Sequence, residues 1–502
     1  MRGALLVCGT HSDAGKSAVA AGLCRWLARE GVRAAPFKAQ NMALNSVVTE
    51  DGCEVGRSQA VQAAAAGVPL EAAMNPILLK PSGERRSQVM VMGHPYADAD
   101  ATGYQALKAT LRPVVADALA DLRRRYDVVV CEGAGSPAEV NLRDGDLVNL
   151  GLARDAGLPV IVVADIDRGG VFASLLGTLA LLDPEDQAHV AGFVINKFRG
   201  DAGILAPGLA ELEARTGRPV LGVLPYGEDL WLDAEDSVAL GGRPEAPAAA
   251  GTIDVAVIRL RWMSNFTDAD ALGAEPGVRV RFTRSPADVE RADLVIVPGT
   301  KATVEDLERL RAGSLDRALI ARAAAGRPIL GVCGGYQLLG ERIDDDVESG
   351  RGAVSGLGVL PVSTQFAREK LLRRRRGRCD WLGTGAAGYE IRHGRPRRHG
   401  GEPVLVADDG EPEGCRAGAV VGISWHGALE HDDFRRALLR WVSPAFVPGR
   451  RPFADVREAR LDALGDLVAE HLDTARLEAL IQSGPPPDLP VLATEVRECC
   501  AS

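Results

Sequence analysis

The stretch that decides the fold of the first half is Gly9-Thr10-His11-Ser12-Asp13-Ala14-Gly15-Lys16-Ser17. It follows an apolar run at residues 4–8 and precedes an amphipathic stretch, so the expected order is strand, glycine loop and helix N-terminus. This order is the context of a P-loop, in which backbone amides and the helix dipole cradle phosphate. We expect Gly9, Thr10, Gly15, Lys16 and Ser17 to bind ATP, with Lys16 on the β- and γ-phosphate oxygens and Ser17 on Mg2+. Thr10 stands where the strict pattern has glycine, and this departure favours the synthetase branch of the P-loop class.

Other polar residues follow apolar strands of the same half, at the edge where the P-loop is expected. Glu132-Gly133-Ala134-Gly135 ends the strand predicted at residues 128–131, which makes Glu132 the first candidate for a second Mg2+ ligand. The alternative for Glu132 is an acid that caps the next turn. Asp51 is a weaker candidate for the same metal. Asn196 ends the strand predicted at 190–195 and is a candidate for reading adenine, although a polar strand terminus explains it nearly as well.

Two further segments are candidates for contact with a polar substrate. Asp165-Ile166-Asp167-Arg168-Gly169-Gly170 ends the strand predicted at 160–164 and points to Asp165 and Asp167. The segment 38–46 is rich in amide side chains, which can both donate to and accept from carboxylate and carboxamide groups. Its candidates for substrate binding are Gln40, Asn41, Asn45 and Ser46.

The alternation of apolar runs with amphipathic stretches predicts two α/β domains in series. In the first, strands expected at 4–8, 128–131, 160–164, 190–195 and 220–224 imply a parallel sheet covered on both faces. Residues 241–251 are rich in Gly, Pro and Ala and are interpreted as a linker. The pattern restarts with strands expected at 253–258, 294–297 and 329–332 and helices at 304–311 and 316–324. We therefore predict a P-loop synthetase domain at 1–240, a second α/β domain at 252–445, and a helix with a flexible tail at 446–502.

A second site is predicted where the strand at 329–332 runs into Cys333-Gly334-Gly335-Tyr336-Gln337. A cysteine on a tight strand-to-helix turn is exposed at a helix N-terminus, where the dipole favours the thiolate. The amide of Gly334, together with that of Gly299 or Thr300, is expected to bind an oxyanion. The alternative for Cys333 is a buried structural thiol, the commonest fate of a lone cysteine.

A thiol nucleophile needs a base, and His426 is the expected one. It ends the strand-like run at 420–425 and precedes Gly427, which places it at a sheet edge where it can face the cysteine. His393 and His431 are the competing candidates.

Composition disfavours several classes of protein. The chain has 502 residues, of which 46% are apolar and 25% charged, and its formal net charge of −10 argues against nucleic-acid binding. No apolar run reaches the ~20 residues that span a bilayer, and the N-terminus shows no signal peptide. Nine cysteines without metal spacing indicate reduced thiols, so a cytoplasmic protein is expected. The run Arg373-Arg374-Arg375-Arg376 is predicted to be a solvated loop, with an anion or partner contact as the alternative.

Together these motifs resemble the cobyric acid synthase family over residues 3–445. The resemblance is carried by the P-loop, Glu132-Gly133-Ala134-Gly135-Ser136-Pro137-Ala138-Glu139, the segments 165–170, 298–301 and 331–337, Gly388-Tyr389-Glu390-Ile391, Trp425-His426-Gly427 and, most specifically, the segments 41–46 and 54–59. It implies a P-loop domain with a mostly parallel sheet, followed by a class I, triad-type glutamine amidotransferase α/β domain. It further implies that ATP and glutamine drive amidation of the b, d, e and g carboxylates of adenosylcobyrinic acid a,c-diamide. Cys333 would form a glutamyl thioester, and His426 would be its base.

One departure concerns the acid that orients the histidine. Many thiol glutaminases carry Glu two residues after the His, whereas position 428 is Ala here. The cobyric acid synthase family is similar in lacking that acid, and Glu390 and Glu430 are the candidates for the orienting residue.

Two alternatives stay open. One is cobyrinic acid a,c-diamide synthase, built from the same two modules, and the other is a P-loop switch ATPase that carries a dead glutaminase domain. The expected partners are small molecules, namely glutamine, ATP and a corrinoid carboxylate, without nucleic acid or membrane; no oligomeric state is predicted. Because ammonia in neutral water is mostly protonated, we also expect a closed route between Cys333 and the P-loop.

Overall fold

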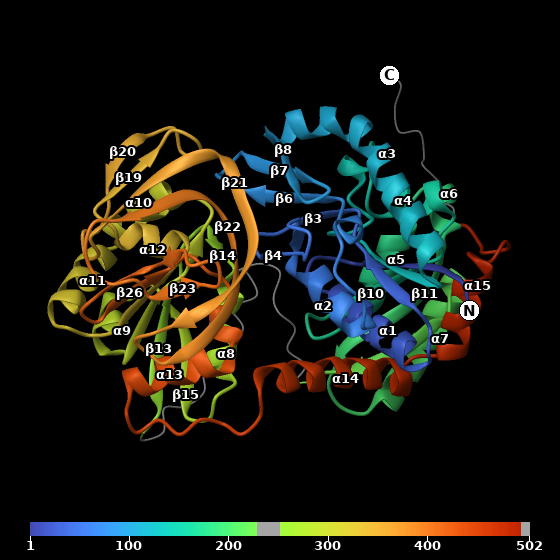
Figure 1. Cartoon of the computed structure of the whole chain (residues 1–502). Coiled ribbons are helices and arrows are strands. Elements are labelled where there is room, and N and C mark those ends of the chain that lie inside the picture. The colour runs from blue at the N-terminus through green and yellow to red at the C-terminus, as the bar shows by residue number, and fades with distance from the viewer. Residues whose placement is uncertain (228–250, 493–502) are drawn as a thin grey trace.

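The computed structural model describes residues 1–227 and 251–492, which form the two α/β halves seen in Figure 1. We call residues 1–227 the first half and residues 251–442 the second half. The linker predicted at 241–251 lies outside the described residues, apart from Gly251. Within the described ranges, no helix has both the length and the apolar character needed to cross a membrane.

The first half is built on a parallel sheet with the strand order β12-β11-β10-β1-β9-β2. Its strands are β1 (Gly3–Gly9), β2 (Ala34–Phe37), β9 (Val128–Glu132), β10 (Val160–Asp165), β11 (Val190–Phe198) and β12 (Val220–Pro225). Every neighbouring pair is parallel, so the carboxyl ends of all these strands meet at one edge. Apart from the edge strand β12 and the end of β11, the strands are almost wholly apolar and buried because helices cover both faces. The predicted mostly parallel sheet is confirmed, and β2 is a strand that was not predicted.

Helices of the first half cover both faces of this sheet. They are α1 (Lys16–Arg29), α2 (Arg57–Ala66), α3 (Ala101–Arg125), α4 (Leu150–Ala156), α5 (Val171–Ala180), α6 (Pro184–Gln187) and α7 (Ala206–Thr216). One core cluster lies under α3, α4 and α5, and another lies under α1 and α2.

A smaller sheet with the order β3-β6-β7-β8 lies on the side of the first half that faces the second half (Figure 1). It consists of β3 (Gln40–Met42), β6 (Ile77–Pro81), β7 (Ser87–Val91) and β8 (His94–Ala99). Beside it, β4 (Ser46–Val48) pairs with β5 (Glu54–Gly56) in antiparallel fashion. β4 contacts strands of the second half, so this region forms part of the boundary between the halves.

The second half has its own central sheet, in the order β15-β13-β16-β18-β26-β25. The strands are β13 (Ile253–Ile258), β15 (Val278–Thr283), β16 (Leu294–Val297), β18 (Ile329–Val332), β25 (Cys415–Ala417) and β26 (Val420–Ile423), and only β25 is antiparallel to its neighbour. A short antiparallel pair, β14 (Met263–Ser264) and β17 (Gly299–Thr300), stands at its carboxyl edge. The helices are α8 (Asp270–Gly273), α9 (Pro286–Arg291), α10 (Thr303–Ala312), α11 (Leu315–Ala324), α12 (Gly334–Leu339) and α13 (Asp432–Val442). The predicted strands and the two predicted helices are present.

A long hairpin of the second half borders the first half. It consists of β21 (Val362–Cys379) and β22 (Thr384–Arg398), in a sheet with β19 (Arg342–Asp345), β20 (Gly352–Ser355), β23 (Leu405–Ala407) and β24 (Pro412–Glu413). The arginine run 373–376 lies inside β21, so its prediction as a solvated loop is wrong. Alternation along the strand directs Arg373 and Arg375 toward Glu390, which accepts from Nε of each at 2.5 Å and 3.2 Å, respectively.

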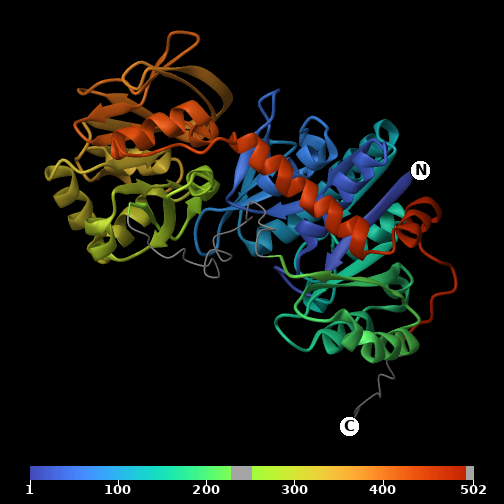
Figure 2. The same ribbon diagram turned by 90° about the horizontal axis from the view of Figure 1, so that it is seen from below.

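The end of the described chain returns to the first half. Figure 2 shows α14 (Phe453–His471) running from the second half across the first, where it lies along α1; α15 (Thr474–Ser483) packs against β1. A Cβ at Gly22 would lie 2.6 Å from the carbonyl oxygen of Leu464, so the close contact between α1 and α14 requires glycine. Apolar side chains of this segment join the core under α1, namely Leu461, Val468, Leu472, Leu477, Leu480 and Ile481. The single predicted helix is thus two helices, and residues 493–502 of the predicted tail lie outside the described residues.

Candidate active site

The P-loop joins β1 to α1 at the carboxyl edge of the main sheet. Helix α1 begins at Lys16, directly after Gly15, whose φ of +107° favours glycine. A Cβ at Gly15 would also lie 1.9 Å from Nδ2 of Asn196, which donates a hydrogen bond to the carbonyl oxygen of Ala14 (3.0 Å). Asn196 therefore braces the loop from β11, and its role in reading adenine stays a prediction.

The charged groups expected for phosphate and metal converge beside this loop. Nζ of Lys16 donates to the carbonyl oxygens of His11 (3.0 Å) and Gly135 (2.9 Å), which holds the ammonium over the loop. Oγ of Ser17 donates to Oε1 of the fully buried Glu132 (2.8 Å) at the end of β9. A hydroxyl and a carboxylate are the hard oxygen ligands that Mg2+ takes, together with phosphate oxygens and water. The residues present therefore fit the metal.

Lys38 is a second cation of this site that was not predicted. Its Nζ donates to the same Oε1 of Glu132 (2.9 Å), and the amide of Gln62 donates to the other carboxylate oxygen. Its position just after β2 was the available signal, because β2 ends at the same sheet edge as the P-loop. Among the described residues, no group of three or more His, Cys, Asp and Glu side chains could hold a metal by itself.

These groups open into a cavity of about 1030 Å³. Gly9 and Thr10 do not line it; Gly9 lies under Lys16, where a Cβ would be 2.9 Å from Cγ. Of the residues predicted for substrate binding, four line the cavity: Gln40, Asn41, Asp165 and Asp167. Arg168 of the predicted segment 165–170 also lines it, together with basic side chains that were not predicted: Lys108, Arg143 and Arg154.

Three predicted residues lie elsewhere. Asp51 is exposed, accepts a hydrogen bond from Thr49 (2.5 Å) and does not line the cavity, so the structure contradicts its assignment to the metal. Asn45 and Ser46 are fully buried at the boundary between the halves and do not line the cavity either. The amide of Ser46 donates to Oδ1 of Asn265 in the second half (2.9 Å). The chain leaves the P-loop edge between β3 and β4, which carries both residues away from the predicted substrate.

Helix α14 adds an apolar wall to the same cavity. Leu464, Leu467 and Val468 line it, as do Leu224 and Tyr226 of the first half. The sequence predicted a helix in this segment but not its neighbour, because a helix about 220 residues beyond the first domain gives no local signal of where it packs.

In the second half, Cys333 forms the turn between β18 and α12. Its φ of +50° and ψ of −110° are unusual for a residue other than glycine and cost free energy. The turn packs tightly, since a Cβ at Gly335 would lie 1.9 Å from the carbonyl oxygen of Val297. Sγ of Cys333 lies 3.7 Å from the carbonyl oxygen of Ile391. The thiol therefore stands on a strained turn at the carboxyl edge of the sheet.

His426 faces the same cavity as Cys333 and is oriented by an aspartate. Its Nδ1 lies 2.7 Å from Oδ2 of Asp268, and Oδ1 of Asp268 accepts a hydrogen bond from the amide of Gly427 (2.7 Å). Burial alone would lower the pKa of His426, but Asp268 and Cys333 raise it to about 10. The imidazolium form is thus favoured beside the thiol, and in that form the ring can protonate a leaving amine.

The acid that orients His426 is Asp268, and the two acids predicted for this role are wrong. Glu390 forms ion pairs with three arginines, namely Arg373, Arg375 and Arg392. Glu430 forms ion pairs with Arg57 and Arg457, so neither acid orients His426. Asp268 lies in a short 3-10 helix, Phe266–Ala269, about 160 residues before His426. The sequence held no signal for it, because the pairing depends on how two distant strand-end segments meet.

The competing histidines have other surroundings. His393 lines the cavity, but its Nε2 lies 3.3 Å from the amide of Gln88, and burial lowers its pKa. His431 does not line the cavity.

Gly299 and Gly334 flank the thiol as the predicted oxyanion residues. A Cβ at Gly299 would lie 2.7 Å from Cε1 of His426, and one at Gly334 would lie 2.8 Å from the backbone nitrogen of Thr300. Both positions therefore require glycine, which allows a backbone amide to approach a reacting carbonyl. Their role as oxyanion donors stays a prediction.

Comparisons with known proteins match both halves of the chain. A family model for a CobQ/CobB/MinD/ParA nucleotide binding domain matches residues 5–238, and one for a CobB/CobQ-like glutamine amidotransferase domain matches residues 254–434. Curated proteins named cobyric acid synthase are similar over almost the whole chain. The one from Frankia casuarinae is 58% identical, covering 98% of this chain and 99% of the relative. Those from Rhodococcus jostii and Streptomyces coelicolor are each 55% identical over 98% of this chain.

Proposed function

This chain belongs to the cobyric acid synthase family, and from that premise we propose that it amidates the b, d, e and g carboxylates of adenosylcobyrinic acid a,c-diamide. It is a glutamine-hydrolysing carbon–nitrogen ligase of cobalamin biosynthesis that carries a P-loop domain for ATP. The observation that supports the proposal best is the pairing of Cys333 with an Asp-oriented His426 in the same chain as a P-loop cavity. Basic side chains along that cavity, such as Arg143 and Arg168, suit an acceptor with several carboxylates.

The glutaminase reaction starts at Cys333. The thiolate attacks the side-chain carbonyl carbon of glutamine, and the oxyanion that forms is expected to accept from the amides of Gly299 and Gly334. His426 then donates a proton to the amide nitrogen, ammonia leaves, and a glutamyl thioester remains. Water next attacks the thioester, with His426 as base, and glutamate is released. Asp268 holds the ring in the tautomer that keeps Nε2 available for these transfers.

The synthetase reaction takes place at the P-loop. The γ-phosphoryl group of ATP passes to a corrinoid carboxylate, because a free carboxylate is a poor electrophile and an acyl phosphate is a good one. Lys16 neutralises charge on the transferring group. Mg2+, held by Ser17 and Glu132, would supply further charge neutralisation on the phosphate oxygens. Ammonia then attacks the acyl carbon, and phosphate leaves as the amide forms.

The two alternatives are less well supported. A switch ATPase with a dead glutaminase has no use for a strained Cys333 turn beside a buried His426–Asp268 pair. Cobyrinic acid a,c-diamide synthase shares both modules, but the similar curated proteins are named cobyric acid synthase. The seven cysteines of the described ranges are all free and buried, which supports a cytoplasmic location.

Mass spectrometry tests the proposal. Adenosylcobyrinic acid a,c-diamide is incubated with the enzyme, Mg-ATP and glutamine, and Cys333→Ala is run in parallel with and without ammonium chloride. Each amidation exchanges a hydroxyl for an amino group, so a product with four successive mass decreases is expected. The variant should form it only with ammonium chloride. An unchanged substrate, with cobyrinic acid amidated instead, would refute the proposed acceptor.

A further inference from the structure

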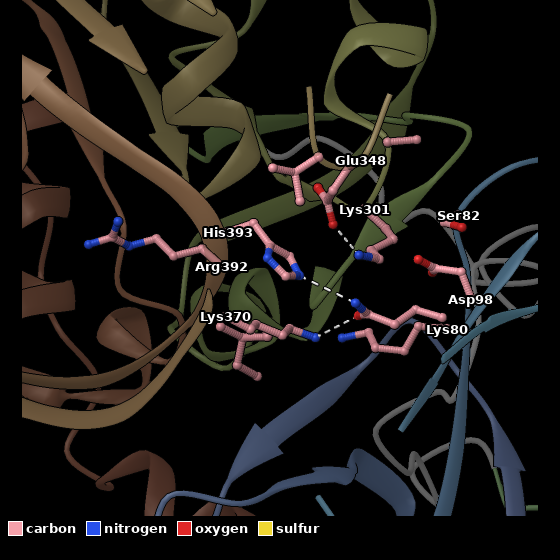
Figure 3. A network of polar contacts seen from close by, with 12 residues as sticks. Lys80, Ser82, Asp98, Lys301, Glu348, Lys370, Arg392 and His393 are labelled. Carbon is pink, nitrogen blue, oxygen red and sulfur yellow. Dashed lines mark hydrogen bonds and ion pairs between the residues drawn. The ribbon is translucent and has the colours of Figure 1, made fainter. Parts of the chain in front are cut away.

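The cavity beside Cys333 is lined in part by a side chain from the other half of the molecule. It has a volume of about 30 Å³ and is lined by Cys333, His426 and other residues of the second half, and also by Lys80 at the end of β6 in the first half. Figure 3 shows Lys80 pointing toward Lys370 of β21 and the His393 ring at this boundary. The thiol site is therefore completed by the half that holds the P-loop.

The cavity wall carries more lysine than carboxylate. Lys80 and Lys370 both pair with one carboxylate, Glu54, and Lys370 does so at 2.6 Å. Lys301 pairs with Glu348. Three lysines thus share two carboxylates, and the side chains of Lys80, Lys370 and Lys301 are only 3%, 3% and 8% exposed. Burying a cation without its own counter-ion is costly, so an anion entering beside these three lysines would be stabilising.

Within residues 1–227 and 251–492, neighbouring groups do not supply a further anion. Arg392 also lines the cavity, but Glu390, its partner, is shared with two further arginines. Asp98, at the edge of the network in Figure 3, lies 3.8 Å from Arg86. Burial lowers the pKa of Lys370 to about 7 against the effect of Glu54, and the neighbouring lysines add to the lowering. An anion that enters beside these lysines would therefore stabilise the charged form of Lys370.

We propose that Lys80 and Lys370 bind the α-carboxylate of glutamine, so that each half contributes one lysine to the glutaminase site. The inference rests on the glutaminase activity proposed above and adds the residues that recognise the amino-acid end of its substrate. Glu348 is the carboxylate that lines the same cavity and is placed to receive the α-ammonium group. Because the cavity of about 30 Å³ is too small for an amino acid, side chains that line it must move as glutamine enters.

The arrangement makes glutamine binding depend on the contact between the halves. β6, which carries Lys80, pairs with β3, whose Gln40 and Asn41 line the P-loop cavity. A shift of this small sheet when ATP or the acceptor binds would therefore move Lys80 relative to Cys333.

The test compares glutamine with L-glutamine α-amide, which lacks the carboxylate, in Lys80→Met and Lys370→Met. Either variant leaves Glu54 with one lysine, so folding should be kept. We expect kcat/KM for glutamine hydrolysis to fall about 10- to 100-fold, the effect of a lost charge-assisted hydrogen bond. Hydrolysis of the α-amide should change by less than about threefold, as expected for a substrate that never made that bond. Ammonia-driven amidation should also be unchanged.

Gln88→Met is the matched control, because Gln88 bonds to Lys370 and His393 but does not line the cavity. It should leave the preference for glutamine over the α-amide intact. Equal losses on the two substrates in the lysine variants, or no loss on either, would overturn the proposal. If the unaltered enzyme hydrolyses neither substrate, as expected for Cys333→Ala, the proposed glutaminase activity itself is refuted. That outcome is distinct from a failure of the proposed lysine contacts.

Discussion

Replacing Asp268 by asparagine tests the view that this residue positions the catalytic histidine. The carboxylate accepts from two groups at once, Nδ1 of His426 and the amide of Gly427, each at 2.7 Å. Asparagine has one oxygen and one NH2 group. If its oxygen keeps the bond to Gly427, its NH2 group faces Nδ1, and the ring proton must move to Nε2. A ring protonated at Nε2 cannot accept the proton of the thiol.

The structure sets the size of the expected loss. Both partners are buried, so the lost bond is a charge-assisted one inside the protein, worth about 1.5–3 kcal/mol. At about 1.4 kcal/mol for each tenfold change, kcat/KM for glutamine hydrolysis should fall about 10- to 150-fold. Asp268 also raises the pKa of His426, whose folded value is about 10. Its removal should lower that pKa, so the activity that depends on the imidazolium should be lost at a lower pH on the alkaline side.

The assay measures glutamate release over a pH series in Asp268→Asn and in Asp270→Asn, the neighbouring acid of the same segment. Amidation with ammonium chloride is measured in the same preparations. That activity should be unaffected in Asp268→Asn, because the P-loop site does not involve His426. A change below about threefold, or an alkaline limb that does not move, would refute the positioning role of Asp268. An equal loss of the ammonia-driven reaction would mean that the variant had damaged the fold.

Three further predictions concern the metal, the boundary and the C-terminal helix. Glu132→Gln should lower amidation about 100-fold or more with either nitrogen source, because the proposed Mg2+ ligand is lost, while glutamine hydrolysis persists. ADP release and glutamate release measure the two reactions, and unchanged amidation would contradict the ligand role. Glu430→Gln should lower the free energy of unfolding by about 1–3 kcal/mol at pH 7, because Glu430 forms ion pairs with Arg57 of α2 and Arg457 of α14. Burial would raise the pKa of Glu430, but those arginines lower it to about 2. The stabilisation by Glu430 is therefore complete above its ordinary pKa of about 4.5 and is lost as the pH falls through 2. Urea titrations should show that the difference in the free energy of unfolding between variant and parent narrows below pH 4.5. Gly22→Val should lower the melting temperature and raise KM for ATP, because the valine side chain would push α14, with Leu464, away from the cavity. An unchanged KM for ATP would show that α14 does not contribute to nucleotide binding.

The parts of the fold that the sequence predicted are those with a local cause. Buried parallel strands are continuous apolar runs, and the glycine loops at Gly15 and Gly334 stand directly between such a strand and a helix. The carboxyl ends of neighbouring strands must then meet, which is why Glu132, Asp165 and Asn196 were found without any contact information.

The parts that were missed depend on long-range packing. Arg373 and Arg375 alternate with other residues in a hairpin whose buried partner is Glu390, and a run of arginines gives no strand signal of its own. Ser46 and Asp51 were wrongly assigned to the P-loop site because the chain turns away from the P-loop after β3. The amide-rich composition of this segment gives no indication of that turn. Asp268 was missed for the same reason: it acts on a residue about 160 positions away.

The return of α14 and α15 to the first half affects how the protein is made. The core under α1 includes apolar side chains from both helices, so the N-terminal domain lacks part of its interior until the chain end has left the ribosome. At about 5–20 residues per second, synthesis of the roughly 225 intervening residues takes about 10–45 s. During that interval the face of α1 around Gly22 and Trp26 is open to chaperones or to misassembly. A gene split at the linker would leave these helices on the wrong polypeptide, whereas a circular permutant that joins them to residue 1 would give each domain its complete core.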